Sequence, residues 1–306
     1  MLKIEHIVKQ FGKVKALDDV SIRIDRGEFF GMLGPNGAGK TTLMNIIVGY
    51  VKADSGSVSF EDKLLSTAEN GTRLNFGYVP QEISLYPELS ALQNLKIFGS
   101  LYGLKKNVML KSIDEVLELV KLNDRKKDAV KNFSGGMKRR LNLAASILHK
   151  PKLLLCDEPT VGIDPQSRNA IFEMLQYLAE QNITIIYTTH HMEEAERLCS
   201  RLVIIDYGKI IAEGSLSEMV NMLDKKETIK IKKHSELKSK IKTLESMGRL
   251  IEFDLEYELI PDVKFNKMSQ LFYSLEELNI PQEFIELSRS TLEDVFLNLT
   301  GRSLRD

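Results

Sequence analysis

Long apolar runs, a charge imbalance and cysteine clusters are all missing from this chain of 306 residues. Because no stretch of about 18 consecutive apolar residues occurs, the sequence predicts no membrane-spanning helix. The formal net charge of −1 gives no electrostatic reason to expect a nucleic-acid partner. The two cysteines, Cys156 and Cys199, lie in apolar stretches without metal-ligand spacing, which favours small buried hydrophobes over metal ligands.

The start of the chain, MLKIEHIVKQFG, lacks the apolar core of a signal peptide, so we expect a cytoplasmic location. A hydrophobic content of 43% and a charged content of 28% are typical of globular proteins. The length allows one large domain and a smaller one.

A glycine-rich segment, GPNGAGKTT at residues 34–42, matches the G-x-x-x-x-G-K-[ST] pattern of a P-loop. A polyphosphate needs many inward-pointing N–H donors, and glycine allows the close approach and positive φ angles that this requires. The apolar run before the segment predicts a buried strand, and the run after it predicts a helix whose N-terminus faces the anion. The predicted nucleotide-binding residues are Gly34, Pro35, Asn36, Gly37, Ala38, Gly39, Lys40, Thr41 and Thr42. Lys40 would supply a cation to the β- and γ-phosphates, and the Thr41 hydroxyl would bind Mg²⁺.

Two acids follow the apolar run at 153–156, which predicts a parallel strand with Asp157 and Glu158 at its carboxyl end, where ligands gather in open α/β sheets. Asp157 suits the Mg²⁺ shell, and Glu158 could activate an attacking water as general base. A second apolar strand, at 183–189, ends at His190, which could touch a γ-phosphate. We expect the adjacent His191 to point to the surface.

A second anion-binding helix start is predicted at Ser134, Gly135 and Gly136, because serine is a good N-cap and glycines admit a phosphate or another backbone. The three basic residues at 138–140 are more typical of a solvated helix face than of a nucleic-acid patch.

Two further positions have open interpretations from the local sequence. Phe11, just before Gly12, could stack on an adenine ring or could simply pack at the end of a strand. Gln81 follows Pro80 where a strand yields to a loop, and on its own it is typical of polar surface. Asp164 lies in a turn that begins at Gly162.

The coarse pattern predicts an α/β core over residues 1–220, with a helical block that begins near residue 88. Residues 222–306 change to short strand–helix units, which predicts a small α+β accessory domain. It has no cluster of histidines, cysteines or paired acids, so we assign it no catalysis. Its last helix is expected to open at a capping box that starts at Ser290.

Six segments over residues 1–220 occur in an order that resembles the nucleotide-binding subunit of ABC transporters: the P-loop, Gln81, SGGM at 134–137, LLLCDEP at 153–159, GID at 162–164 and TTH at 188–190. The resemblance implies a P-loop NTPase core with an antiparallel β subdomain, a helical subdomain at about 88–150, and ATP and Mg²⁺ as cofactors. It implies that Phe11 stacks the adenine and that Gln81 contacts Mg²⁺ and senses a membrane subunit. Ser134, Gly135 and Gly136 would bind the γ-phosphate of ATP held by a second subunit.

For the acid–base residues, the resemblance implies that Glu158 is the catalytic base, Asp164 the D-loop residue and His190 the switch histidine. The tail TLEDVFLNLTGR resembles ATP-binding subunits of the daunorubicin-resistance and sodium-extrusion types of exporter. The implied partners are integral membrane permease subunits and a second ATPase subunit, identical or homologous, at the inner face of the cell membrane. An ABC ATPase acting on ribosomes or nucleic acid is the alternative, and an importer subunit is disfavoured by the tail alone.

Overall fold

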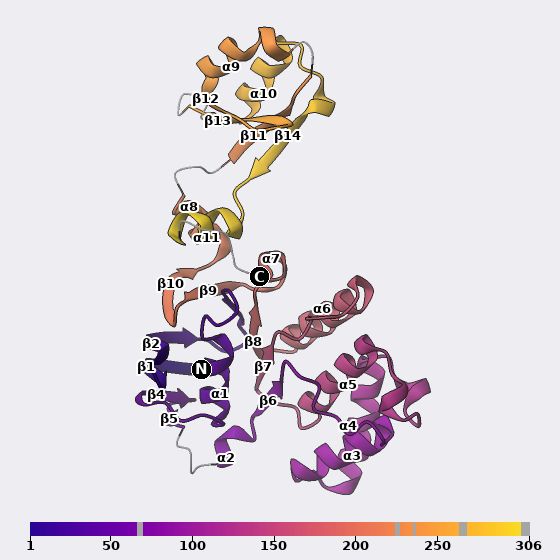
Figure 1. The fold of residues 1–306 in the computed structure, drawn as a ribbon. Coiled ribbons are helices and arrows are strands. Elements are labelled where there is room, and N and C mark those ends of the chain that lie inside the picture. The colour runs from indigo at the N-terminus through magenta and orange to yellow at the C-terminus, as the bar shows by residue number, and fades with distance from the viewer. Residues whose placement is uncertain (66–69, 224–226, 235–236, 263–267, 301–306) are drawn as a thin grey trace. The chain divides into compact units, whose positions relative to one another are not determined.

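The computed structural model describes residues 1–65, 70–223, 227–234, 237–262 and 268–300, which form two compact units. The first unit is Met1–Leu216, and the second begins at Ser217 (Figure 1). The change in sequence pattern at residues 220–222 lies a few residues beyond this division.

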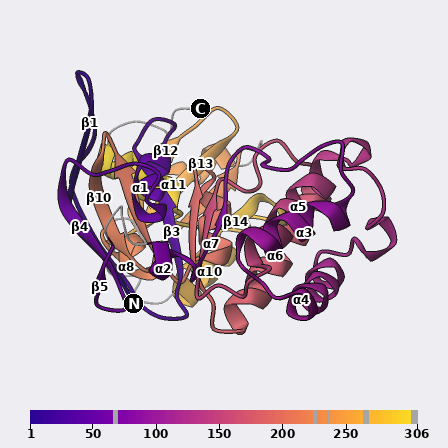
Figure 2. The same ribbon diagram turned by 90° about the horizontal axis from the view of Figure 1, so that it is seen from below.

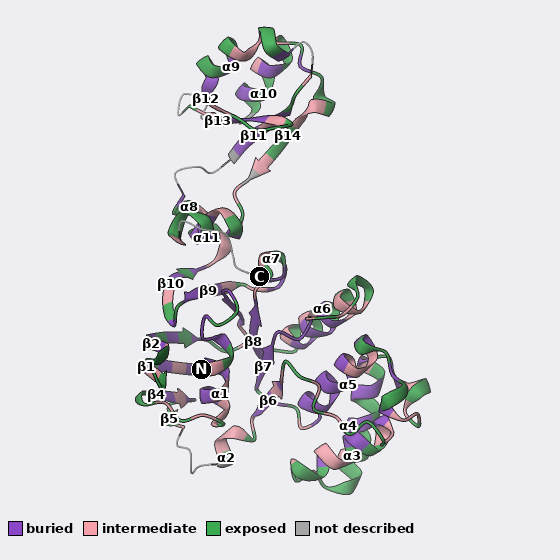
Figure 3. Cartoon of the chain, in the orientation of Figure 1, coloured by how far each residue is buried: buried purple, intermediate pink, exposed green. Residues whose placement is uncertain are grey.

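A six-stranded sheet forms the centre of the first unit, in the order β10-β9-β3-β8-β7-β6. Its strands are β3 (Phe29–Leu33), β6 (Phe76–Val79), β7 (Leu153–Asp157), β8 (Thr184–Thr189), β9 (Arg201–Asp206) and β10 (Lys209–Gly214). All neighbours pair in parallel except β9 and β10. Every residue of β3, β7 and β8 is buried, as expected for strands that are covered on both faces (Figure 3). The strands β3, β8 and β7 are therefore neighbours, and their carboxyl ends lie at one edge.

An antiparallel sheet, in the order β2-β1-β4-β5, forms a second layer of the first unit. It contains β1 (Leu2–Phe11), β2 (Val14–Ile24), β4 (Ser55–Phe60) and β5 (Lys63–Leu64). Apolar side chains of this sheet share one core with β3 and with α1 (Lys40–Val48). A short helix, α2 (Asn70–Arg73), precedes β6.

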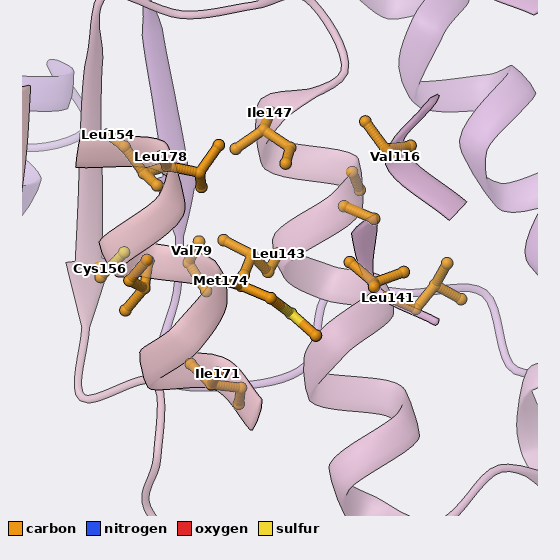
Figure 4. Close-up of a cluster of buried hydrophobic side chains, with 14 of the residues drawn as sticks. Val79, Val116, Leu141, Leu143, Ile147, Leu154, Cys156, Ile171, Met174 and Leu178 are labelled. Atoms are coloured by element: carbon orange, nitrogen blue, oxygen red, sulfur yellow. The ribbon is translucent and has the colours of Figure 1, made fainter. Parts of the chain in front are cut away.

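Helices gather on the other side of the first unit, away from the antiparallel sheet (Figure 2). They are α3 (Ala91–Leu101), α4 (Lys106–Leu119), α5 (Gly135–Ile147) and α6 (Pro165–Glu180), with 3₁₀ turns at Asn123–Arg125 and Val130–Asn132, and α7 (Met192–Leu198) follows β8. Leu141, Leu143 and Ile147 of α5 contribute to the same buried cluster as Ile171 and Met174 of α6 (Figure 4). This packing holds the start of α5 beside the start of α6.

The second unit has a β-α-β-β-α-β order with an antiparallel sheet β12-β13-β11-β14. Its elements are α8 (Leu216–Asn221), β11 (Glu227–Lys232), a 3₁₀ turn (Leu237–Ser239), α9 (Ile241–Met247), β12 (Gly248–Glu252), β13 (Glu256–Pro261), α10 (Met268–Glu277), a 3₁₀ turn (Gln282–Phe284), β14 (Ile285–Arg289) and α11 (Leu292–Thr300). The predicted capping box is wrong by one residue. Thr291 rather than Ser290 caps α11, because Thr291 Oγ1 accepts from Asp294 N and Asp294 Oδ2 accepts from Thr291 N.

Candidate active site

The P-loop joins the carboxyl end of β3 to the N-terminus of α1. Gly39 caps this helix with a φ of 111°, and Gly37 has a φ of 81° at the exposed tip beside Asn36. A Cβ placed on Gly34 would lie 2.1 Å from the carbonyl oxygen of Ile205, so close packing against β9 requires glycine there. The loop therefore has the backbone curvature needed to direct several N–H groups at one anion.

Lys40 is buried, with 4% of its side chain exposed, and its ammonium lies against the loop that precedes it. Its Nζ donates to the carbonyl oxygens of Gly34 at 2.7 Å and Pro35 at 3.1 Å. The same atom lies 3.1 Å from Glu158 Oε1, and this is a buried ion pair because Glu158 is only 5% exposed. Lys40 therefore links the P-loop directly to Glu158, the predicted catalytic base.

Two other predicted residues converge on the second oxygen of the same carboxylate. Gln81 Nε2 donates to Glu158 Oε2 at 3.3 Å, and His190 Nδ1 lies 3.3 Å from that oxygen. Glu158 itself has a φ of 44°, a left-handed conformation that residues other than glycine seldom adopt and that clusters at functional sites. Its backbone N–H donates to Thr188 Oγ1 at 3.0 Å, which holds the turn at the end of β7.

Asp157 is 1% exposed and has one oxygen with a partner and one without. Oδ1 accepts from the hydroxyls of Thr188 at 2.7 Å and Thr41 at 3.2 Å, whereas Oδ2 is buried and has no hydrogen-bond partner. Burial raises the pKa of this carboxyl, while hydrogen bonds from Thr188 and Thr41 act in the opposite direction. An unpartnered carboxylate oxygen beside the Thr41 hydroxyl fits a hard cation with oxygen ligands.

The described part of the chain contains no group of three or more His, Cys, Asp or Glu side chains that could hold a metal by themselves. The Asp157 carboxylate and the Thr41 hydroxyl could therefore supply only part of the ligands of a cation here, and substrate phosphates and water would supply others. Mg²⁺ is usually bound in this way, through one or two carboxylates and substrate phosphates.

The predicted second anion site lies at the start of α5. Ser134 caps the helix, and its Oγ accepts from Met137 N at 3.2 Å. The two glycines have different surroundings. A Cβ on Gly136 would lie 2.0 Å from Ser167 Oγ in α6, whereas a Cβ on Gly135 would meet no atom within 4 Å. Gly136 therefore permits packing against α6, and Gly135 presents a free surface.

Two of the remaining predicted residues lie apart from Glu158. Phe11 is the last residue of β1, and 50% of it is exposed. It is therefore not the packed aromatic residue of the alternative interpretation. Lys9 Nζ lies 5.1 Å from the centroid of its ring. Asp164 caps α6, where its Oδ1 accepts from Ser167 N at 2.9 Å, and hydrogen bonds from Ser167 lower its pKa. Both side chains are accessible to a ligand or to another chain.

Comparison with known proteins agrees with this geometry. The family model described as ABC transporter matches residues 17–161. The linearmycin resistance ATP-binding protein LnrL of Bacillus subtilis (strain 168) is 41% identical over 313 aligned residues, with 100% of both chains covered. The chain belongs to the ABC transporter family.

Other relatives of this ABC protein carry export or resistance names. The Nod factor export ATP-binding protein I of Cupriavidus pinatubonensis is 36% identical, over 100% of this chain and 92% of that protein. The daunorubicin resistance ATP-binding protein DrrA3 of Streptomyces coeruleorubidus is 34% identical, over 97% and 95%. The resemblance to the daunorubicin-resistance type that the sequence predicted is thereby confirmed.

Solved structures of the family match 70–72% of the chain. An ATP-binding subunit of an ABC transporter has a TM-score of 0.67 and 29% identity, and covers 72% of this chain and 92% of its own. A dimeric cassette, MJ0796, bound to ADP and phosphate after hydrolysis, has a TM-score of 0.64 and 25% identity, over 70% and 98%. The predicted fold class is confirmed, and the chain is an ATP-binding and ATP-hydrolysing subunit whose hydrolysis is coupled to transport.

No helix in the described part of the chain has both the length and the apolar character that a membrane span requires.

Three sets of contacts around Glu158 were missed or misjudged from the sequence. Thr188, near the carboxyl end of β8, joins Asp157 to the backbone of Glu158. Glu194 is buried in α7 and accepts from three hydroxyls: Thr160 at 2.9 Å, Tyr187 at 2.9 Å and Thr189 at 2.8 Å. It thereby connects the loop after Glu158 to β8, the strand that precedes His190.

The third concerns Arg139. The prediction of a solvated helix face is wrong there, because Arg139 is 6% exposed and all its hydrogen bonds go to main-chain carbonyls. An arginine in a run of basic residues gave no signal of this burial.

Proposed function

We propose that this chain powers a membrane exporter of a drug-like or lipid-like substrate, working at the inner face of the membrane with integral permease subunits. The observation that carries the proposal is the similarity over the full chain to proteins named for resistance and export, which extends beyond the shared ATPase core into the second unit. The permease would select the transported substrate. The ATPase would supply the energy, and its closing and reopening would set when the permease changes conformation.

For hydrolysis, we propose that Glu158 is the general base that activates the attacking water. The ammonium of Lys40, now paired with Glu158, would move to the β- and γ-phosphates of ATP, because a polyphosphate offers it several anionic oxygens. That transfer would free one carboxylate oxygen of Glu158 to accept a proton from water. Gln81 and His190 lie against the other oxygen, where they would orient the carboxylate and sense the γ-phosphate.

Mg²⁺ is proposed as the second cofactor, held by Thr41 and Asp157 with a contact from Gln81. When bound, it would neutralise charge on the β- and γ-phosphates. The buried, unpartnered oxygen of Asp157 supports this assignment, since its desolvation is costly unless a cation or a donor satisfies it. Thr188 would hold the carboxylate from behind and leave that oxygen directed to the metal.

Two copies, or this chain and a homologous one, are proposed to bind ATP head to tail. Ser134 and Gly135 of one subunit would meet the γ-phosphate bound at the P-loop of the other, with Gly136 and Asp164 next to the contact. Phe11, half exposed at the end of β1, would stack on the adenine. Closure would follow from γ-phosphate contacts that exist only when both faces meet, and hydrolysis would remove them.

Gly135 and Gly136 provide a matched pair of variants. Gly136→Ala should lower the free energy of unfolding by about 1–3 kcal/mol, because its methyl group would collide with Ser167. Gly135→Ala should keep the stability within about 0.5 kcal/mol of the wild type, yet reduce ATPase activity, because its methyl group would stand between two subunits. Thermal unfolding and steady-state ATPase assays measure both effects. Full activity in Gly135→Ala would contradict the proposed contact.

The transport proposal is tested by affinity purification of the tagged full-length chain, with ATP, from solubilised membranes of its native host. We expect an integral membrane protein in stoichiometric amount, identified by mass spectrometry. Two controls test whether recovery depends on nucleotide. One is the same purification without ATP, and the other uses the Lys40→Met variant as the bait. Recovery of ribosomes or nucleic acid without a membrane protein would overturn the exporter and favour the alternative of a regulatory ABC ATPase.

A further inference from the structure

A buried polar stripe runs along α5, the helix that begins at the SGG segment. Arg139, Asn142 and Ser146 occupy positions i, i+3 and i+7, which share one face of a helix, and they are 6%, 3% and 5% exposed. The helix otherwise buries apolar residues, among them Leu141, Leu143 and Ile147 in the cluster of Figure 4. Polar side chains are seldom buried in this way unless they are hydrogen-bonded.

All three side chains bond to one segment of the chain, residues 78–84, which contains Gln81. Ser146 Oγ donates to the carbonyl oxygen of Tyr78 at 2.6 Å, and Asn142 Oδ1 accepts from Ser84 N at 3.3 Å. Between them, Arg139 Nη1 donates to the carbonyl oxygens of Pro80 at 3.2 Å and Gln81 at 2.6 Å. The stripe therefore fixes the main chain on both sides of Gln81.

Arg139 also reaches the loop after Glu158, the proposed general base. Its Nη2 donates to the carbonyl oxygen of Val161, three residues beyond Glu158, at 3.4 Å. One guanidinium thus contacts both segments that flank the Glu158 carboxylate. Only a planar group with several N–H donors in fixed directions can do this, since a lysine ammonium is a compact point charge.

This burial carries an energetic cost. Within the described part of the chain, Arg139 has no ion pair with a carboxylate and its Nε has no hydrogen-bond partner. Desolvation lowers the pKa of the guanidinium, so the surroundings disfavour its charged form. Burying a charge against carbonyl groups alone lowers the free energy of unfolding relative to an apolar residue of similar size at the same position.

We infer that Arg139 is a positioning residue for ATP hydrolysis: it holds the main chain of Gln81 so that the Gln81 amide meets Glu158. The inference rests on the role proposed above for Gln81. Because Arg139 stands five residues after Ser134 on the same helix, it also joins the start of α5 to the Gln81 loop. A shift of Gln81 would thereby be transmitted to the surface that meets the second subunit.

The test is a double-mutant cycle between Arg139→Gln and Gln81→Ala in the full-length chain, with kcat and KM for ATP as the measured quantities. We expect Arg139→Gln to lower kcat about ten- to a hundredfold, the range that a small displacement of a catalytic group produces, with KM little changed. In the Gln81→Ala background the same substitution should have no further effect on kcat. Arg139→Lys should recover part of the loss, because one ammonium can reach one carbonyl group but not both segments.

The matched control is Lys138→Gln, which removes the same charge from the neighbouring residue. Within the described ranges the Lys138 side chain makes no hydrogen bond or ion pair, so kcat should stay at the wild-type value. If Arg139→Gln unfolds below the assay temperature, the cycle is repeated with Arg139→Lys.

Each outcome has a distinct meaning. Equal losses with and without Gln81, or wild-type kcat in Arg139→Gln beside a loss in Gln81→Ala, would overturn the inference and leave the role of Gln81 standing. Wild-type kcat in Gln81→Ala would instead overturn the proposed role of Gln81 itself. A lower melting temperature with unchanged kcat in Arg139→Gln would show that Arg139 only stabilises the fold, and this would also overturn the inference.

Discussion

Replacing Glu158 with Gln should leave ATP binding intact and reduce the rate of ATP hydrolysis by at least about 100-fold, the usual contribution of a general base. The substitution keeps the size of the side chain, and the amide oxygen can still accept from Lys40. What it removes is the basic oxygen that would take a proton from water. Because bound ATP then persists, the closed dimer should accumulate, and size exclusion with ATP should show a dimer where the wild type elutes as a monomer.

The control for this substitution is Glu193→Gln, which changes an exposed acid in the first turn of α7 in the same way. It should alter neither turnover nor the elution profile. Near-normal turnover in Glu158→Gln would refute the assignment of the base. Loss of turnover without accumulation of a dimer would refute the head-to-tail closure and leave the base assignment in place.

The position of Glu158, the proposed general base, was predictable because it depends on one topological rule. Glu158 follows β7, His190 follows β8 and the P-loop follows β3, and the carboxyl ends of parallel strands meet at the same edge of a sheet. An apolar run that ends in a polar residue is visible in a sequence. The order β3-β8-β7, which makes these three strands neighbours, is a property of the fold and could not be derived from the residues alone.

Contacts between distant segments explain what was missed. Arg139 bonds to Gln81, which lies 58 residues earlier, and no local pattern distinguishes it from the exposed basic residues found on many helices. Gly135 and Gly136 are identical in the sequence, and only the approach of Ser167 from α6 separates a packing role from an open surface. Short-range patterns therefore predicted segments that meet at Glu158 in the structure, while the contacts that position these segments could be found only from the three-dimensional structure.

Replacing Lys40 with Met should lower the affinity for ATP about 10- to 100-fold, because each lost hydrogen bond to a charged group is worth about 1.5–3 kcal/mol. Isothermal titration or a fluorescent ATP analogue would measure this loss. The same change should also lower the melting temperature, since it leaves the Glu158 carboxylate buried without its cation, and breaking a buried pair costs about 3–5 kcal/mol.

The double variant Lys40→Met/Glu158→Gln separates these two effects. Removing both charges takes away the unpaired carboxylate, so the melting temperature should recover most of the loss seen in Lys40→Met. The affinity for ATP should stay low, because the phosphates still lack their ammonium. Recovery of ATP affinity along with stability would show that Lys40 acts only through its pairing with Glu158, and unaltered affinity in Lys40→Met alone would refute the phosphate-binding role of the P-loop lysine.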